Sequence, residues 1–299
     1  MNSPYQPVTE ELRRWIVAQA QAGCRPDDVL AAMLASGWNE AVAAAAMEKA
    51  LLDHLSTQGK PLPATAAPPP PPPPPPSAPP VLALPGLALQ GGAARLLAAG
   101  HEVDVLTTLQ LPRVVVFGRL LSDDECTGLM ALAAPRLARS ETVDNATGGT
   151  EVNAARTSDG MFFARGEAPL ITRIEQRIAA LLHWPVDHGE GLQILRYRPG
   201  AEYRPHHDYF DPVHPGTERI LQRGGQRVAS LVMYLNTPDG GGATTFPDVG
   251  LEVWPVRGNA VFFSYDKPHP STRTLHGGAP VTAGEKWVAT KWLRQGVFV

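Results

Sequence analysis

Three residues in the second half of the chain have the types and spacing of a metal site. His206 and Asp208 are separated by one residue, and His276 follows much later. In a β-strand alternate side chains share a face, so His206 and Asp208 would point to the same side and His207 to the other. A later strand that ends at His276 could bring the second histidine to them. Two histidines and one carboxylate leave three positions open, which suits non-haem Fe(II), whereas a zinc hydrolase usually leaves one.

A lysine follows this group at the start of a hydrophobic segment. Lys286 lies in the sequence GEKW, ten residues after His276. Such a lysine either leaves its charge at the edge of the sheet or pairs with an anion inside. A buried ammonium without a partner is costly, so an interior Lys286 implies an acidic ligand, and the distal carboxylate of 2-oxoglutarate would serve.

The elements that must position these residues are short strands. Eight segments between residues 192 and 294 have the composition of strands and are separated by Gly and Pro. They are residues 192–197, 202–208, 227–236, 243–246, 251–254, 260–264, 271–276 and 286–294. Strands at that spacing indicate a jelly roll, and no helix is expected after residue 192.

Helices are predicted before the strands. A β-branched run at 113–117 precedes a capping box at Ser122 and Glu125, which opens an amphipathic helix ending near Leu137. A second helix is predicted from Pro169 to about His183. These helices would pack on one face of the double sheet, so we predict an α+β fold for residues 101–299.

The first hundred residues have a different character. Residues 1–57 predict a small three-helix module, with Thr9 and Asn39 as caps and Pro26 in a first helical turn. It loosely resembles ubiquitin-associated modules, and it could bind an unknown protein or simply dock or dimerise. Residues 58–100 are expected to form a proline-rich linker, whose run of prolines at 68–76 favours a semi-rigid polyproline II spacer.

Six ordered segments of residues 101–299 resemble the collagen- and plant-type prolyl 4-hydroxylases. They are RTSDGMF at 156–162, LQILRY at 192–197, YRPHHDYF at 203–210, GGQR at 224–227, GGATTFP at 241–247 and KWVATKW at 286–292. The resemblance says nothing about the first hundred residues. It implies a double-stranded β-helix and hydroxylation of prolyl residues at the 4-position, with release of succinate and CO₂.

The resemblance also implies roles for individual residues. Iron would be held by His206, Asp208 and His276, and 2-oxoglutarate by Lys286 with help from Tyr197 and Thr244. O₂ would be the second substrate, and ascorbate would keep the iron reduced. Tyr203 and Arg227 would lie beside a proline-containing protein or peptide, under a flap formed by residues 156–162.

Two positions depart from the family pattern. Arg294 stands where members of the family often have a histidine shortly after the final tryptophan, and Asp159 stands in the flap where a small residue is more usual. Two other functions stay open: an oxygenase of a free amino acid or small molecule, and a non-catalytic binding module.

Composition limits which partners and which cellular location are expected for the chain. The formal net charge is −3 and no basic block is present, so nucleic acid is an unexpected partner. The two cysteines, Cys24 and Cys126, are too few for a disulfide framework, which favours a reducing cytoplasm. The polar N-terminus and the lack of a long apolar run predict neither export nor insertion into a membrane.

Overall fold

The computed structural model describes residues 6, 8–58, 71–72, 82–86, 94–140, 142–143, 149–151 and 157–299. The chain forms two compact units, residues 1–80 and 81–299, and each is described by itself. The predicted polyproline spacer lies outside the described residues except at positions 71 and 72.

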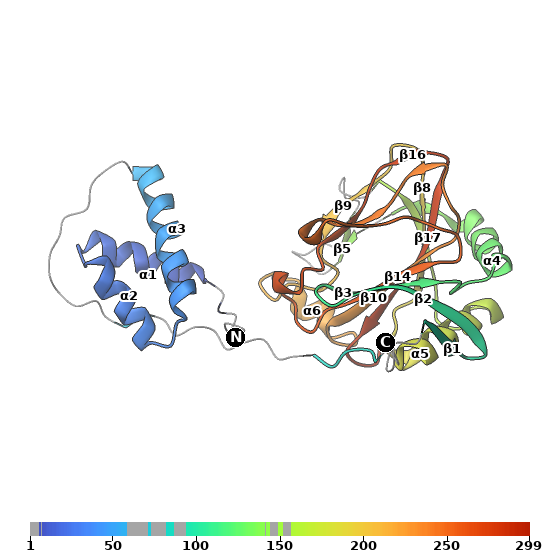
Figure 1. The fold of residues 1–299 in the computed structure, drawn as a ribbon, viewed down its shortest axis with the longest axis horizontal. Coiled ribbons are helices and arrows are strands. Elements are labelled where there is room, and N and C mark those ends of the chain that lie inside the picture. The colour runs from blue at the N-terminus through green and yellow to red at the C-terminus, as the bar shows by residue number, and fades with distance from the viewer. Residues whose placement is uncertain are drawn as a thin grey trace. The chain divides into compact units, whose positions relative to one another are not determined.

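The first unit is a bundle of three helices (Figure 1). They are α1 (Glu10–Gln21), α2 (Pro26–Ala35) and α3 (Glu40–Gln58). The Thr9 side chain accepts a hydrogen bond from the Leu12 N–H, and the Asn39 side chain accepts one from the Ala41 N–H, so both predicted caps form. Leu12, Ile16, Val29 and Met33 are buried between the helices. Among the helices that the structure describes, none is long and apolar enough to cross a membrane.

The second unit is built on a nine-stranded antiparallel sheet with the order β1-β2-β3-β14-β10-β17-β8-β7-β4. Its strands are β1 (Arg95–Ala98), β2 (His101–Leu109), β3 (Arg113–Gly118), β4 (Ala138–Arg139), β7 (Asp159–Phe163), β8 (Leu192–Tyr197), β10 (Arg227–Tyr234), β14 (Ala260–Ser264) and β17 (Lys286–Arg294).

A four-stranded antiparallel sheet packs against the large one, in the order β13-β12-β15-β9. Its strands are β9 (Tyr203–His206), β12 (Thr244–Phe246), β13 (Leu251–Val253) and β15 (His276–Gly278). Two short pairs complete the described strands: β5 (Thr142–Val143) with β6 (Thr150–Glu151), and β11 (Gly240–Gly241) with β16 (Val281–Ala283). Phe246 of the small sheet meets Phe263 of the large sheet edge to face at 5.3 Å, so the two sheets share a core.

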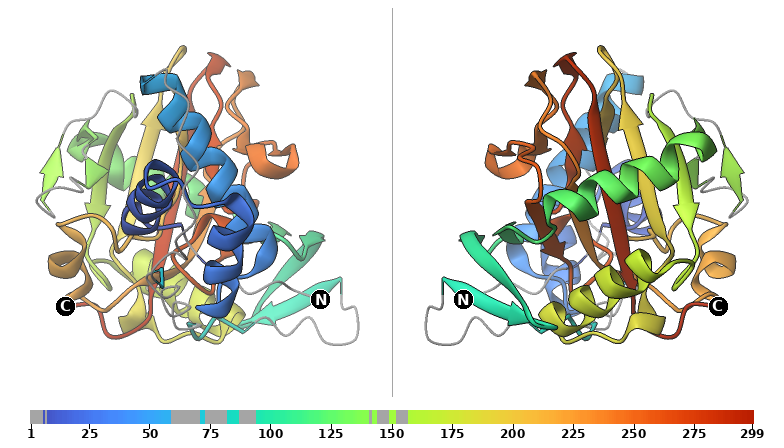
Figure 2. Two further views of the ribbon diagram at one scale, coloured as in Figure 1. Left: turned by 90° about the vertical axis from the view of Figure 1, so that its left-hand side faces the viewer. Right: turned by 90° about the vertical axis from the view of Figure 1, so that its right-hand side faces the viewer.

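Alternation along the strands gives the large sheet two different faces. On β10, Leu231 and Met233 pack in one core with residues of the helices, whereas Val232 and Tyr234 pack in the core between the sheets. Helices α4 (Asp123–Ala133) and α5 (Pro169–Leu182) cover the first face, as the right-hand view of Figure 2 shows. The predicted α+β jelly-roll fold is confirmed, and its second face carries the site.

Several predicted boundaries were wrong. Helix α4 ends at Ala133, and a 3-10 turn (Ala134–Arg136) follows it. Strand β9 ends at His206 rather than at Asp208, and β15 begins at His276 rather than ending there. A 3-10 turn (Pro270–Thr272) precedes β15 because proline lacks an N–H for the ladder, and Arg273 then turns the chain with φ 53°. A short helix α6 (Thr217–Leu221) forms where no helix was expected.

The predicted start of the catalytic domain at residue 101 also lies too late. Residues of β1 pair with β2 inside the large sheet, and Leu82 is buried in the core beneath the helices. The Leu82 N–H also donates to the Asp266 carbonyl at 2.7 Å. Part of the segment predicted as linker, residues 58–100, therefore belongs to the second unit.

Candidate active site and metal centre

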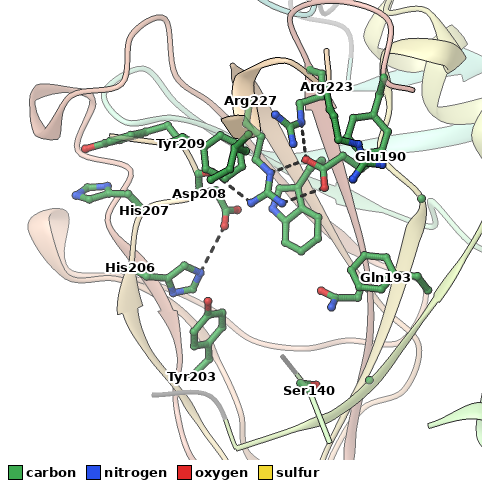
Figure 3. A pocket seen from close by; sticks show the side chains of 18 of the residues that line it. Ser140, Glu190, Gln193, Tyr203, His206, His207, Asp208, Tyr209, Arg223 and Arg227 are labelled. Atoms are coloured by element: carbon green, nitrogen blue, oxygen red, sulfur yellow. Dashed lines mark hydrogen bonds and ion pairs between the residues drawn. The ribbon is translucent and has the colours of Figure 1, made fainter. Parts of the chain in front are cut away.

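The fold brings the three predicted metal ligands together. His206 and His276 are cross-strand partners in the small sheet, and Asp208 follows two residues after His206. One donor atom from each lies within 4.8 Å of the other two. His206 Nε2 is 3.5 Å from Asp208 Oδ1, and His276 Nε2 is 3.5 Å from Asp208 Oδ2. Figure 3 shows His206 and Asp208 facing the same pocket while His207 points away, as the alternation predicted.

The hydrogen bonds of the two histidines leave their Nε2 atoms as donors to a metal. His206 Nδ1 lies 2.9 Å from the Arg204 carbonyl, and His276 Nδ1 lies 3.0 Å from the Thr274 carbonyl. A carbonyl only accepts, so each Nδ1 carries a proton, and a ring in its neutral form presents its lone pair at Nε2. Burial lowers the pKa of His276 to about 4, which keeps that ring neutral at pH 7.

The carboxylate of Asp208 is held in place from behind. Ser230 Oγ donates to Asp208 Oδ2 at 2.5 Å, and Tyr265 Oη lies 3.2 Å from Ser230 Oγ. Burial alone would raise the pKa of Asp208, but nearby positive charge, including that of the buried Arg227 guanidinium, holds it well below its usual range. The carboxylate is therefore ionised and fixed in orientation.

These features fit a divalent cation. A carboxylate and the lone pair of His276 Nε2 face each other at 3.5 Å with no proton between them, which is favourable only with a cation in the gap. Ligand bonds of about 2.0–2.2 Å put neighbouring donors roughly 3 Å apart, close to the separations found. A set of two imidazoles and one carboxylate suits Fe(II).

Lys286 forms the second half of the predicted site. It opens β17 opposite Tyr197 of β8, and its side chain is buried. Nζ lies 5.5 Å from the centre of the Tyr197 ring and 5.8 Å from that of Tyr234. Among the residues that the structure describes, no carboxylate forms an ion pair with this ammonium. Burial lowers the pKa of Lys286 to about 8, so the ammonium is charged at neutral pH. A buried positive charge of this kind is stabilised by an anionic ligand.

The surroundings of Lys286 fit 2-oxoglutarate. Gly278 lies two residues after His276, and a Cβ at that position would stand 3.9 Å from Lys286 Nζ. The absent side chain leaves room on the metal side of the lysine. The predicted Thr244 is buried in the same region, where its hydroxyl accepts a hydrogen bond from Tyr234 Oη at 2.9 Å. A diacid with one carboxylate at Lys286 can extend along β15 toward His276.

Comparison with known proteins agrees with this geometry. Residues 192–294 match the model of the 2OG-Fe(II) oxygenase superfamily. Probable prolyl 4-hydroxylase 3 of Arabidopsis thaliana is 39% identical over 208 residues, which are 62% of this chain and 71% of that protein. The chain belongs to the prolyl 4-hydroxylase family. The predicted enzyme class, with Fe(II) and 2-oxoglutarate as its cofactor and cosubstrate, is confirmed.

Two further proteins are similar to this chain. Prolyl 4-hydroxylase 1 of Arabidopsis thaliana is 43% identical over 201 residues, which are 62% of this chain and 69% of that protein. A solved structure of a viral collagen prolyl hydroxylase from Paramecium Bursaria Chlorella virus-1, in a 2OG complex, is 29% identical. It covers 60% of this chain and 95% of its own, with a TM-score of 0.48.

Two of the three candidate metal ligands, His206 and Asp208, line a cleft of about 1240 Å³. Tyr203 lines it and stacks on His206, with ring centres 3.7 Å apart. Trp292 and Phe162 also line it, and their rings lie 6.5 Å apart. The cleft therefore offers apolar surfaces next to the metal ligands.

Arg227 lines the cleft too, but its guanidinium is hydrogen-bonded to other residues of the chain. It bonds Glu190 through Nε at 2.7 Å and Nη2 at 3.0 Å, and Nη1 donates to the Asp208 carbonyl at 3.3 Å. Trp292 lies 4.0 Å from its guanidinium carbon. Burial alone would lower the pKa of Arg227, but Glu190 raises it. Arg227 and Glu190 are both buried, so this ion pair lies inside the protein and not on its surface.

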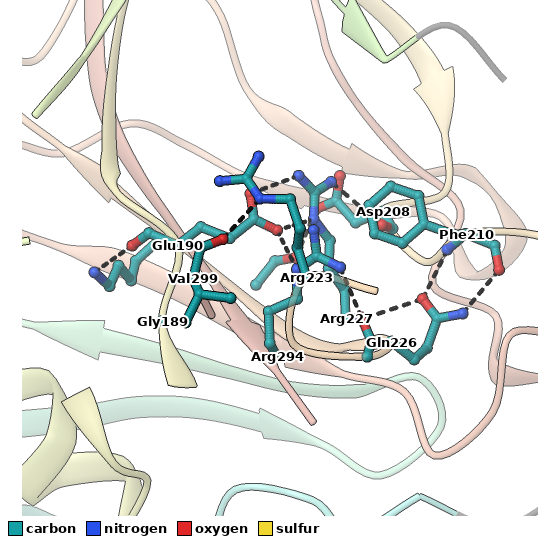
Figure 4. A network of polar contacts seen from close by, with 12 residues as sticks. Gly189, Glu190, Asp208, Phe210, Arg223, Gln226, Arg227, Arg294 and Val299 are labelled. Carbon is teal, nitrogen blue, oxygen red and sulfur yellow. Dashed lines mark hydrogen bonds and ion pairs between the residues drawn. The ribbon is translucent and has the colours of Figure 1, made fainter. Parts of the chain in front are cut away.

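Arg294, the departure from the family pattern, joins the same network (Figure 4). Its Nε donates to Glu190 Oε1 at 2.7 Å, and its Nη1 donates to the Gly225 carbonyl at 2.7 Å. Glu190 thus holds two buried arginines, and Gln226 adds a pair of 2.8 Å hydrogen bonds to the main chain of Phe210. The network fixes the segment that carries Asp208.

The predicted flap is partly wrong. Arg156 lies outside the described residues, but Asp159 opens strand β7, which pairs with β8 in the large sheet. The Asp159 carboxylate forms ion pairs with Arg196 at 2.9 Å and Arg198 at 3.3 Å. Pairing with β4 and β8 makes residues 159–163 a strand of the sheet. Asp159 is paired with two arginines there and is not available to bind a peptide.

The sequence analysis did not identify Ser230, Tyr234, Tyr265 or Glu190. A signal was available for two of them, because Ser230 and Tyr234 interrupt an apolar strand at alternate positions and so mark its site-facing side. Tyr265 directly follows β14, and Glu190 lies in a loop before β8. No local pattern distinguishes these last two from ordinary surface residues.

Proposed function

We propose that this enzyme hydroxylates C4 of prolyl residues within a protein or peptide, using iron at His206, Asp208 and His276 and 2-oxoglutarate anchored by Lys286. The observation that carries the proposal is an open cleft of about 1240 Å³ that runs past the two ligands of the 206–208 segment. Pockets for small molecules measure about 300–1000 Å³, so the cleft has room for several residues of a peptide. The names of the relatives point the same way.

Bound iron, 2-oxoglutarate and O₂ would supply the oxidising chemistry, with succinate and CO₂ as products and ascorbate keeping the iron reduced. The chain's own residues hold the geometry. Ser230 and Tyr265 orient the Asp208 carboxylate, and the Thr274 and Arg204 carbonyls set the tautomers of the histidines. The second carboxylate of 2-oxoglutarate meets the Lys286 ammonium, whose buried charge it neutralises.

Two residues would position the substrate or its surroundings. Tyr203 stacks on His206 and presents its ring to the cleft, so it can pack against a prolyl ring. Arg227 is a positioning residue, because its contacts are Glu190 and the Asp208 main chain. We propose that it sets the place of Asp208 rather than binding the peptide directly.

The test compares a proline-containing peptide with free proline. We expect the peptide to stimulate succinate release and to gain one oxygen on proline, found as 4-hydroxyproline by amino-acid analysis, with free proline a poor competitor. His206→Ala and Lys286→Ala should abolish this turnover, whereas Arg198→Gln, an exposed change away from the cleft, should not. Equal competition by free proline would favour the alternative of a small-molecule oxygenase. A purified protein that neither binds Fe(II) nor consumes 2-oxoglutarate would favour a non-catalytic binding module.

Two further proposals concern the rest of the chain. A cytoplasmic location is supported by the cysteine count, because two cysteines are too few for a disulfide framework. A protein partner for the three-helix module is supported by its being a compact unit with a core of its own.

A further inference from the structure

The cleft beside the metal ligands is rich in arginine. Seven arginines line it against four carboxylates, an excess of three positive charges, although the whole chain has a net charge of −3. Positive charge is therefore concentrated where a substrate must enter. Clefts lined by one sign of charge attract ligands of the opposite sign.

The lining carboxylates have roles inside the protein. Glu167 pairs with Arg136, and Glu190 is shared by Arg227 and Arg294. Asp208 faces the two histidines. The fourth, Asp211, accepts a hydrogen bond from the Val213 N–H at 2.9 Å. Three of the four carboxylates are thus occupied by partners inside the site, and Asp211 alone is left to offset the remaining arginines.

Arg204 pairs with Glu202 at 3.6 Å, so three exposed arginines of the cleft are left over. The side chains of Arg139 and Arg219 form no ion pair or hydrogen bond with any residue in the described part of the chain. Arg223 is held from behind: its Nε donates to the Val299 main-chain oxygen at 2.8 Å, and its guanidinium lies 4.5 Å from the Phe298 ring. Its two terminal nitrogens remain available, in the fork geometry that binds carboxylates.

These arginines flank the metal ligands. Figure 3 shows Arg223 and Ser140, the neighbour of Arg139, on opposite sides of the pocket into which His206 and Asp208 point. Arg219 belongs to helix α6 and lies four residues before Arg223 in the sequence. An extended peptide advances about 3.1–3.4 Å per residue, so residues two or three places from a proline at the metal pass roughly 6–10 Å to either side.

We propose that this cleft selects prolyl residues flanked by Asp or Glu within about three residues, with Arg139, Arg219 and Arg223 as the residues that recognise those carboxylates. The inference rests on the proposed function and specifies its substrate class. The three arginines contact the residues on either side of the proline and not the reacting carbon. Their removal should therefore change KM and leave kcat nearly unchanged.

The experiment uses three peptides that differ only in the residues flanking one proline: Glu, Gln or Lys. For the full chain at low salt, we expect kcat/KM to be at least tenfold higher for the Glu peptide than for the Lys peptide, and the gap to narrow as salt screens the charges. Each single change, Arg139→Gln, Arg219→Gln or Arg223→Gln, should lower the preference about threefold. Arg198→Gln, whose arginine is 63% exposed but outside the cleft, should not alter it.

Charge reversal gives a second readout that a loss of stability cannot imitate. In Arg223→Glu, kcat/KM should rise for the Lys peptide and fall for the Glu peptide. Equal kcat/KM for the three peptides, or a preference that persists in the combined Gln variant, overturns this inference and leaves the proposed function standing. If no peptide gains oxygen while free proline does, the proposed function and this inference both fall.

Discussion

Ser230→Ala tests whether Asp208 is a metal ligand held in place by its neighbours. Ser230 is fully buried and donates to the buried carboxylate at 2.5 Å. A hydrogen bond to a charged group contributes about 1.5–3 kcal/mol, and 1.4 kcal/mol corresponds to a factor of about 10. The variant should therefore bind Fe(II) or Co(II) about 10-fold to 100-fold more weakly, the range found when groups that orient a ligand are removed.

The assay is an anaerobic titration with Co(II) or Fe(II) that yields Kd without any catalytic turnover. Ser264→Ala is the matched control, because Ser264 is also buried but binds Arg113 rather than Asp208. We expect wild-type Kd for the control and the weakened Kd only for Ser230→Ala. An unchanged Kd in Ser230→Ala, with its fold intact by thermal unfolding, would refute the role assigned to this hydroxyl.

Three further predictions follow from the same geometry. Burial lowers the pKa of Lys286 to about 8, so the ammonium is charged below that pH and neutral above it; Kd for 2-oxoglutarate should rise up to about tenfold per pH unit above 8, and a flat profile would contradict this. Glu190→Gln leaves two arginines buried without a counter-charge and should lower the free energy of unfolding by about 3–5 kcal/mol in urea titrations, against less than about 1 kcal/mol for Glu202→Gln, whose carboxylate is only partly buried. In Gly277→Ala the new Cβ would stand 2.9 Å from a carbonyl of β9, so metal binding should weaken although no ligand changes; unaltered Co(II) affinity would show that the two strands can separate without cost.

The sequence was sufficient for the directions of the side chains at the start of the site. His206 and Asp208 point to one side and His207 to the other, although strand β9 itself ends at His206, and Lys286 is buried inside the roll. These positions follow from a period of two and from the cost of burying a charge. The caps at Thr9 and at Ser122 were predictable for the same reason, since each depends on residues within one helical turn.

What the sequence could not give depends on contacts between distant segments. Glu190 and Arg294 lie about a hundred residues apart, and the contact between the loop before β8 and the end of β17, where the Glu190 N–H donates to the Trp292 carbonyl, brings them together. Strand β7 was expected to be part of a flap, because its short sequence does not indicate that it pairs with β8. The first strand of the sheet, β1, was likewise hidden in a segment whose composition indicates a linker.

One measurement tests the central claim most directly: succinate and hydroxyproline quantified in the same reaction, with Fe(II), 2-oxoglutarate, ascorbate and a proline-containing peptide. The account predicts equal amounts of the two products for the wild type and neither product for His276→Ala or Lys286→Ala. Hydroxyproline that still forms at the wild-type rate in either variant, or succinate released without any oxygen gained by the peptide, would contradict it.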